Sequence, residues 1–310
     1  MTLSSLDNLD RDIIDRLRRD PSISNKDIAN ATGASESTVG ARIRALDEMG
    51  AMRLVAVRDI RALGYEYLAH CAMDVQGDIR KVARELAKIP EIAMVAMYPD
   101  SPEIIVQINA RTRQDLARLL NQEFAAFPDI ARIDTTVVLY IAKYNTQLGT
   151  NLSQPPEVIR GNCEDTDEDI IAALQVNARV SNREIARQLD LPESTVRNRI
   201  RRLVELKQIQ ITLITDVSVV GRPVSAWLKI AAQPKHARLV MEALSAHEAF
   251  DFVGLCSNKF NIVTVVAAKS QSDLADLVHR HVRSLPGVQQ VEVRTNTEVL
   301  KFRYSEVRIK

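Results

Sequence analysis

Apolar positions near the start of the chain recur with the period of an α-helix. One stripe consists of Leu9, Ile13, Ile14 and Leu17, and the helix that it predicts ends at Asp20, since Pro21 forces the residue before it out of the helical conformation. A second helix is predicted between the serine cap Ser24 and Gly33, and a third begins after the cap Ser35. Two helices joined by so tight a turn, with basic and hydroxyl side chains outside, are typical of a helix-turn-helix motif.

The pattern changes after the third helix. Apolar strands are predicted at 67–75, 94–98, 104–108 and 131–142, and amphipathic helices at 78–89 and 112–127. This order, βαββαβ, is that of a ferredoxin-like domain.

The whole pattern occurs twice. Residues 167–207 repeat residues 10–50 at a constant offset of 157 without a gap, and 18 of the 41 paired positions are identical. The second set of strands and helices is predicted at 224–231, 236–246, 252–255, 261–267, 271–285 and 288–301. A period this long, present only twice, indicates two copies of a complete folding unit rather than a solenoid. The predicted fold is therefore α+β, with two tri-helical or winged helix-turn-helix domains and two ferredoxin-like domains in tandem.

The boundaries of these patterns predict five segments. They are a helix-turn-helix domain at 1–50, a ferredoxin-like domain at 51–143, a linker at 144–165, a second helix-turn-helix domain at 166–208 and a second ferredoxin-like domain at 209–310. The linker lacks periodicity and contains Pro155 and Pro156.

Composition limits the class of protein. A chain of 310 residues with 46% apolar and 26% charged residues is typical of a globular protein with two or more domains. The first residues lack a basic segment followed by an apolar one, and no apolar run approaches the ~18 residues of a membrane span, so we expect a cytoplasmic protein without a membrane partner. Three scattered cysteines predict free thiols, and the histidines are poorly spaced for a metal, so neither a metal nor another cofactor is expected. With a net charge of +1, any contact with nucleic acid must depend on local clusters.

The two third helices differ in charge. Residues 35–50 carry two arginines against three carboxylates, whereas residues 192–207 carry four arginines and one lysine against two carboxylates. Because cations neutralise phosphates while Arg, Asn and hydroxyl groups read bases, the second copy is expected to be the stronger DNA reader. Arginines on a helix can also serve only to solvate it, but their place in a duplicated helix-turn-helix favours DNA contact. The residues expected to contact DNA are Ser37, Thr38, Arg42, Arg44, Ser194, Thr195, Arg197, Asn198, Arg199, Arg201 and Arg202.

These motifs together resemble those of the Lrp/AsnC (feast/famine) family of bacterial transcription regulators. The resemblance is carried by SNKDIA, STVGARIRAL and FPDIARIDTTVVLYIAK in the first copy and by SNREIA, STVRNRIRRL and LPGVQQVEV in the second. It implies a DNA-binding transcriptional regulator with a small-molecule effector and with homo-oligomers formed through the ferredoxin-like regulatory domains. Members of the family usually carry one such unit, so this chain resembles a fusion of two. Its two regulatory domains are expected to pair with each other, within one chain or by exchange between two chains.

The turn before the third strand departs from the family. Members commonly carry Gly-x-x-Asp there, whereas this chain has SPEI at 101–104 and NKFN at 258–261, so a response to common amino acids is expected to be weak or absent. The residues expected to line an effector site are Tyr98, Asp100, Ser101, Ser257, Asn258 and Asn261.

An enzyme is the alternative function. Sirohaem decarboxylases are similar to this chain in their two-domain fold, and they use His, Tyr and Arg around a tetrapyrrole. The nearest matching stretches here, 95–106 and 253–266, contain neither histidine nor arginine. The chain is therefore expected to be a regulator and not an enzyme.

Overall fold

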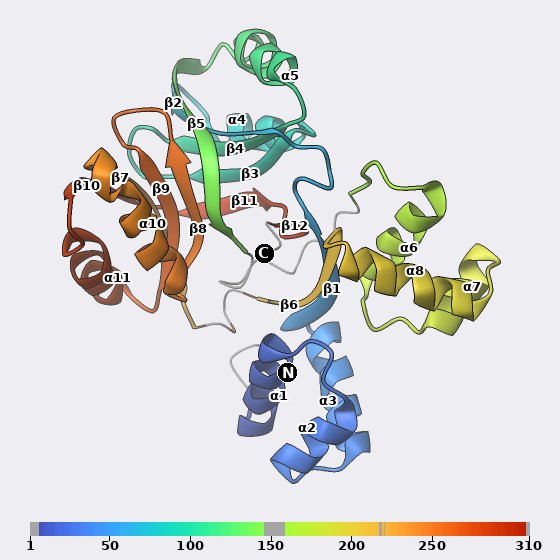
Figure 1. Cartoon of the computed structure of the whole chain (residues 1–310). Coiled ribbons are helices and arrows are strands. Elements are labelled where there is room, and N and C mark those ends of the chain that lie inside the picture. Colours follow the sequence, from blue (N-terminus) through green and yellow to red (C-terminus); the bar gives the residue numbers. More distant parts are fainter. Residues whose placement is uncertain (1–5, 146–158, 217–218, 220, 308–310) are drawn as a thin grey trace. The chain divides into compact units, whose positions relative to one another are not determined.

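The computed structural model describes residues 6–145, 159–216, 219 and 221–307. The chain forms two compact units, and each draws on both halves of the sequence (Figure 1). The helical unit contains the described parts of residues 1–63, 146–221 and 304–310, and the barrel unit contains residues 64–145 and 222–303. Most of the linker expected at 144–165 lies outside the described residues.

The first helix-turn-helix forms as predicted. Helix α1 (Asn8–Arg19) is followed by Asp20 as its C-cap, α2 (Asn25–Thr32) starts from Ser24, and α3 (Glu36–Glu48) starts from Ser35. Gly33 ends α2 with a φ of 73°, a left-handed conformation that glycine adopts without strain.

The second helix-turn-helix repeats this arrangement. It consists of α6 (Asp165–Val176), α7 (Asn182–Leu189) and α8 (Glu193–Glu205). Asp190 takes the left-handed position of Gly33, with a φ of 53°. Each set of three helices encloses its own apolar core, around Ile28 and Val39 in the first copy and around Ile185 and Val196 in the second.

A small sheet joins the two helix-turn-helix domains. Strand β1 (Met52–Asp59) pairs antiparallel with β6 (Ile209–Thr215), and β12 (Glu306–Val307) pairs parallel with β1. Leu213 of β6 lies in the core of the first three helices and Ala56 of β1 in the core of the second, so each strand packs against the helices of the other copy.

The sequence analysis predicted neither β1 nor β6. Seven of the eight residues of β1 are buried, so no alternation of polar and apolar positions marks this strand. Because β1 and β6 pair beneath the helices, they belong to the helical unit, and the two compact units therefore differ from the division expected at 50/51 and 208/209.

The barrel unit contains a βαββαβ set from each copy. The first set is β2 (Tyr67–Val75), α4 (Ile79–Ala87), β3 (Ile92–Met97), β4 (Ile104–Ala110), α5 (Arg113–Arg118) and β5 (Ile130–Tyr144). The second is β7 (Val224–Ala232), α10 (Ala237–Ala246), β8 (Phe250–Cys256), β9 (Ile262–Ala268), α11 (Gln271–Val278) and a last strand divided into β10 (Val288–Thr295) and β11 (Glu298–Phe302). One π-helical turn continues α5 over Leu119–Glu123 and α11 over His279–Arg283. The predicted α+β fold is confirmed.

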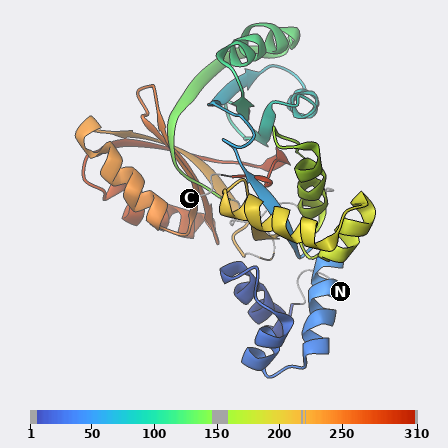
Figure 2. The same ribbon diagram turned by 45° about the vertical axis from the view of Figure 1, so that its right-hand side comes forward.

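The last strand of each copy crosses to the other copy. Strand β5 pairs with β2 of its own copy and with β8 of the second, while β10 pairs with β7 and β11 pairs with β3 of the first copy. The sheet order is β10-β7-β9-β8-β5-β2-β4-β3-β11, so its two ends are consecutive strands of the chain. Figures 1 and 2 show α10 lying against the strands of the second set.

Alternate residues of β2 face opposite sides of the sheet. On β2, Cys71 and Met73 pack with α4 in the core of the first copy, which turns the residues between them away from that helix. His70 and its equivalent Trp227 (offset 157) contact each other with ring centroids 5.6 Å apart. A contact between equivalent residues is expected near the axis that relates two copies.

Among the described residues, no helix has both the length and the apolar character needed to cross a membrane.

Candidate nucleic-acid interface and effector loops

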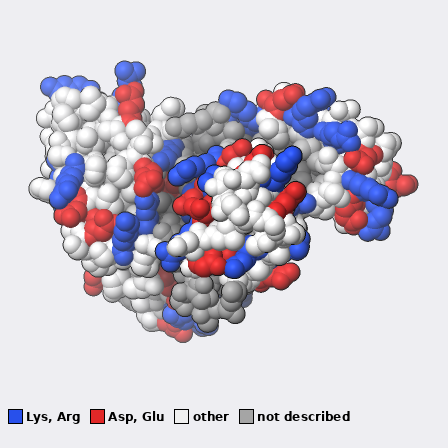
Figure 3. All heavy atoms as spheres, turned by 90° about the horizontal axis from the view of Figure 1, so that it is seen from below, with Lys and Arg blue, Asp and Glu red and all other residues white. Residues whose placement is uncertain are grey.

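The two third helices present most of the predicted DNA-contacting residues to solvent. Ser37, Thr38 and Arg44 of α3 are exposed, as are Ser194, Arg197, Asn198, Arg201 and Arg202 of α8. Figure 3 shows basic and acidic side chains interspersed on the face in view, so DNA binding would depend on a few well-placed arginines rather than on a broad basic surface.

Arg42 and its equivalent Arg199 are half-buried and already paired. The Arg42 guanidinium lies 2.9 Å from Asp7 and 3.2 Å from Asp10. In the second copy, Arg199 lies 3.0 Å from Glu164 and 2.8 Å from Asp167. Because these carboxylates occupy equivalent positions at the start of α1 and α6, the duplicated ion pairs fasten each third helix to its first helix.

The other arginines of α8 have weaker attachments. Arg197 pairs with Glu193 one turn earlier at 2.7 Å, and Arg201 lies 3.9 Å from Glu205 and donates to Asn198 at 3.2 Å. Ion pairs between exposed side chains contribute only ~0–1 kcal/mol, so a phosphate or a base can replace the carboxylate at small cost. Arg202 is exposed beside them.

The hydroxyl residues differ between the copies. In the first copy the Ser35 hydroxyl accepts from the Thr38 N–H at 3.1 Å and lies 2.8 Å from the hydroxyls of both Ser37 and Thr38. In the second copy Pro192 stands at the cap and provides no such group, while Thr195 is half-buried. The α3 hydroxyls are therefore tied into the helix cap, whereas Ser194 is exposed on the first turn of α8.

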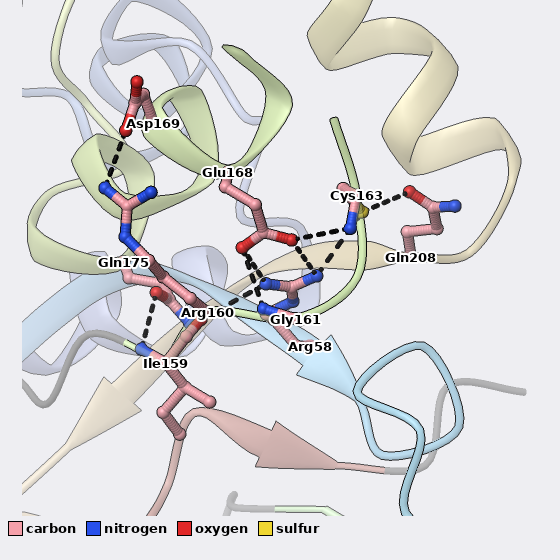
Figure 4. A network of polar contacts seen from close by, with 9 residues as sticks. All are labelled: Arg58, Ile159, Arg160, Gly161, Cys163, Glu168, Asp169, Gln175 and Gln208. Carbon is pink, nitrogen blue, oxygen red and sulfur yellow. Dashed lines mark hydrogen bonds and ion pairs between the residues drawn. The ribbon is translucent and has the colours of Figure 1, made fainter. Parts of the chain in front are cut away.

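A buried ion pair holds the second helix-turn-helix (Figure 4). Arg58 of β1 is fully buried, and its two terminal nitrogens lie 2.6 and 3.0 Å from the carboxylate of Glu168 on α6. The same carboxylate accepts from the backbone N–H groups of Gly161 and Cys163 at 2.9 and 3.0 Å. Burial raises the pKa of Glu168, but these hydrogen bonds outweigh it and lower the pKa to about 2.

This network has no equivalent in the first copy. Arg58 corresponds to Thr215 and Glu168 to Arg11, so the network fixes only the second helix-turn-helix. A β-carbon on Gly161 would lie 2.6 Å from an Arg58 nitrogen, which is why the chain has glycine where it crosses the guanidinium. Arg160 pairs with Asp169 at 2.6 Å beside it, and the Cys163 thiol donates to Gln208 at 3.1 Å (Figure 4). The sequence alone did not predict this network, although Gly161 and Cys163, which lie between Pro156 and the start of α6, were a signal for it.

The predicted effector residues of the first copy are dispersed. Tyr98 is buried, and burial raises the pKa of its hydroxyl above the usual value. Asp100 is exposed, and the exposed Ser101 donates to Asp74 at 2.5 Å.

In the second copy the equivalent loop is held by amide groups. The Asn258 side chain donates to Thr136 of the first copy at 2.8 Å, and Ser257 is exposed. Asn261 accepts from the N–H of Ala232 and donates to its carbonyl, both at 2.9 Å. Glu103 in the first copy likewise accepts from the N–H of Val75, so Asn261 and Glu103 fasten the same pair of strands in the two copies.

A polar group of side chains lies between the two halves of the barrel unit. His70 is 1% exposed and packs edge-on against Phe252, with ring centroids 5.3 Å apart. Burial lowers the pKa of His70 to about 4; a hydrogen bond with Gln107 raises it slightly and the charge of Lys229 lowers it further. Gln107 in turn donates to Tyr144 at 2.9 Å. Among the described residues, no three His, Cys, Asp or Glu side chains gather in a way that could hold a metal ion.

Family models match most of the chain. The AsnC-type helix-turn-helix domain matches residues 6–47 and 164–204, the Lrp/AsnC ligand binding domain matches 70–148, and the PF0864 C-terminal dimeric alpha+beta barrel domain matches 234–308. The HTH-type transcriptional regulator FL11 of Pyrococcus horikoshii is 34% identical over 145 residues, which are 46% of this chain and 95% of the relative. FL11 of Pyrococcus furiosus is 32% identical over the same length. The chain belongs to the Lrp/AsnC family of helix-turn-helix transcriptional regulators. The helix-turn-helix model matches it twice, and each of these relatives, over nearly its whole length, matches about half of the chain.

The chain also resembles a solved structure over almost its whole length. The crystal structure of the siroheme decarboxylase NirDL covers 96% of both chains with a TM-score of 0.66 and 14% sequence identity. At this identity the likeness shows the tandem fold alone.

Proposed function

We propose that this chain is a sequence-specific DNA-binding transcriptional regulator in which the second helix-turn-helix is the stronger reader of DNA. The observation that carries the proposal is the surface of α8, where Arg197, Asn198 and Arg201 stand exposed on a helix whose inner face is buried. The family of the chain and the name of its relatives as transcriptional regulators support it.

The exposure and the ion pairs of these side chains support different roles for the predicted residues. Arg197, Asn198, Arg201 and Arg202 have solvent-facing side chains that can reach base edges or phosphates. Arg42 and Arg199 hold the third helices in place through Asp10 and Asp167, and contact DNA only with the part of the guanidinium that these carboxylates leave open.

Substitutions on the two third helices test the proposal. Arg197→Ala and Arg201→Ala should each weaken binding to a genomic target by ~1–3 kcal/mol if the arginine reads a base, while Arg44→Ala should cost less and act mainly on the salt dependence. Titration of labelled target DNA at several salt concentrations measures both quantities. Equal losses from α3 and α8 substitutions would contradict the stronger role of the second copy.

We infer that a small-molecule effector and further assembly act through the barrel unit. Asp100, Ser101 and Ser257 are exposed in or beside the loops that differ most from the family pattern. Of the other predicted residues, Asn258 and Asn261 hold their loop through hydrogen bonds, and Tyr98 is buried. Calorimetry with a panel of amino acids should show weak or no binding, and light scattering should show an assembly larger than one chain.

The alternative is a decarboxylase, which the tandem fold of NirDL favours. Against it, the His70 imidazole is fully buried and contacts the rings of Trp227 and Phe252. Mixing the protein with an iron-uroporphyrin and recording the Soret band separates the two functions, since a regulator without a tetrapyrrole site leaves the band of the free pigment unchanged.

A further inference from the structure

The turn between α6 and α7 reaches across to the first helix-turn-helix. Ala178 packs into the core of the first copy, and its N–H donates to the carbonyl of Leu54 on β1 at 2.8 Å. This bond fixes the next residue, Arg179, whose guanidinium donates to the side chain of Asn25 at 2.9 Å. Asn25 is the first residue of α2, so a cation from the second copy lies at the helix of the first copy that crosses the DNA backbone in helix-turn-helix proteins.

A second arginine, Arg44, lies near the amide nitrogen of Asn25. A β-carbon on Gly40 of α3 would meet the Asn25 amide at 3.3 Å and the Arg44 guanidinium at 3.8 Å. Arg44 and Arg179 therefore flank the same small region formed by Asn25 and Gly40. Within the described parts of the chain, neither arginine has an ion pair with a carboxylate; Arg179 donates to the Asn25 amide, and burial lowers the pKa of Arg179.

The arrangement exists on one side only. The equivalents of Ala178 and Arg179 are Pro21 and Ser22, and proline has no N–H to donate to Ile211, the equivalent of Leu54. The first copy therefore lends no arginine to the second. In the second copy an arginine is already present, because Arg197 occupies in α8 the position that Gly40 occupies in α3.

We propose that Arg179 and Arg44 together bind one DNA phosphate at the first helix-turn-helix, with Arg179 supplying from the second copy the guanidinium that α3 lacks at Gly40. This proposal rests on the DNA-binding function proposed above. Phosphate oxygens accept two hydrogen bonds from a guanidinium, and the two non-bridging oxygens of one phosphodiester can accept from both arginines, neither of which has a carboxylate partner among the described residues. At this phosphate, Arg179 would thereby add a second guanidinium to Arg44, which is the only arginine of α3 that is not paired with a carboxylate among the described residues.

The test is a salt titration of binding to a mixed-sequence DNA duplex by the full chain. Loss of one phosphate contact shallows the slope of log K against log salt by about 0.9, which corresponds to ~8-fold weaker binding at 0.1 M salt. Arg179→Ala should show this change and Arg179→Lys, which keeps the charge, should show little of it. Arg238→Ala removes an exposed arginine of the barrel unit, paired with Glu242, and should leave the slope unchanged.

Two further variants distinguish one shared phosphate from two separate contacts. Arg44→Ala combined with Arg179→Ala should lose about as much slope as either alone, whereas additive losses would contradict a shared phosphate. Gly40→Arg should restore the slope of Arg179→Ala, because the Asn25 amide that the new side chain meets is the free end of a flexible group.

The outcomes also separate this inference from the proposed function. If the native chain binds the duplex and Arg179→Ala keeps the native slope, the inference is wrong and DNA binding stands. If the native chain binds no DNA at any salt concentration, both are wrong. Should Arg179→Ala melt at a lower temperature than the native chain, Arg179→Gln, which can still donate to Asn25, gives the same comparison in a folded protein.

Discussion

Residues that the sequence ranks alike have different roles in the folded chain. Arg42 and Arg44 both belong to the outer part of α3, yet Arg42 joins α3 to Asp10 of α1 while Arg44 is exposed. Spacing along a helix predicts which face a residue occupies, but whether its charge is already used depends on a carboxylate far away in the sequence. The exposed arginines of α8 could therefore be predicted from sequence, whereas the pairing of Arg42 and Arg199 could not.

The pH dependence of stability tests the placement of His70. The pKa of His70 is about 4 in the folded chain and near 6.5 in the unfolded chain, so the unfolded state binds more protons between these values. The free energy of unfolding should therefore increase with pH from about 4 to 6.5, by up to roughly 3 kcal/mol, and then level off. Urea denaturation of the native chain and of His70→Gln across this range isolates the contribution. An identical pH dependence in both proteins would show that the imidazole is not buried in its neutral form.

At the scale of elements, the spacing of apolar and polar residues predicted nearly every helix and strand of the barrel unit. It missed β1 because seven of its eight residues are buried, so polar and apolar positions do not alternate along it, and β6, with an exposed position near its start and three buried ones at its end, does not alternate regularly either. It joined β10 to β11 because the break at 296–297 leaves the apolar pattern intact. The pairing of strands from different copies also cannot be predicted from the apolar pattern of one copy. Strand β5 pairs with β8 and strand β11 pairs with β3, and in both cases the partner is an edge strand of the other copy that has a neighbour from its own copy on one side only.

The attachment of α6 to β1 provides a test at this scale. Glu168→Gln leaves the buried guanidinium of Arg58 without a charge partner, and breaking one side of such a pair costs ~3–5 kcal/mol. Replacing both residues, as in Arg58→Met with Glu168→Leu, should cost much less. Chemical denaturation measures the two values, with Asp169→Asn as a control that breaks the exposed pair with Arg160. A Glu168→Gln protein as stable as the native one would contradict the buried pair.

The same pair adds a pH effect at the acid end. Because the folded pKa of Glu168 is lowered to about 2, its contribution is complete above the unfolded value of 4.5 and is lost as pH falls toward 2.

At the scale of the whole molecule, the chain joins two unlike copies of one unit covalently. Each unit combines both copies, through β1 with β6 in the helical unit and through the crossed last strands in the barrel unit. Duplication in the sequence predicted two copies of every domain. The differences between the copies come from single positions, such as Pro21 opposite Ala178 and Gly40 opposite Arg197, and only the structure shows which contacts they remove.

The central claim is that one chain binds DNA with two unlike helix-turn-helix domains. Hydroxyl-radical footprinting on a genomic target, at a known ratio of chains to DNA, tests it most directly. The account predicts two protected half-sites per chain, spaced by one helical turn of ~10 base pairs or a multiple of it, with Arg197→Ala removing protection from the better-defined half-site and Arg179→Ala weakening the other. Protection of a single half-site, or of two identical half-sites that both disappear with Arg197→Ala, would contradict it.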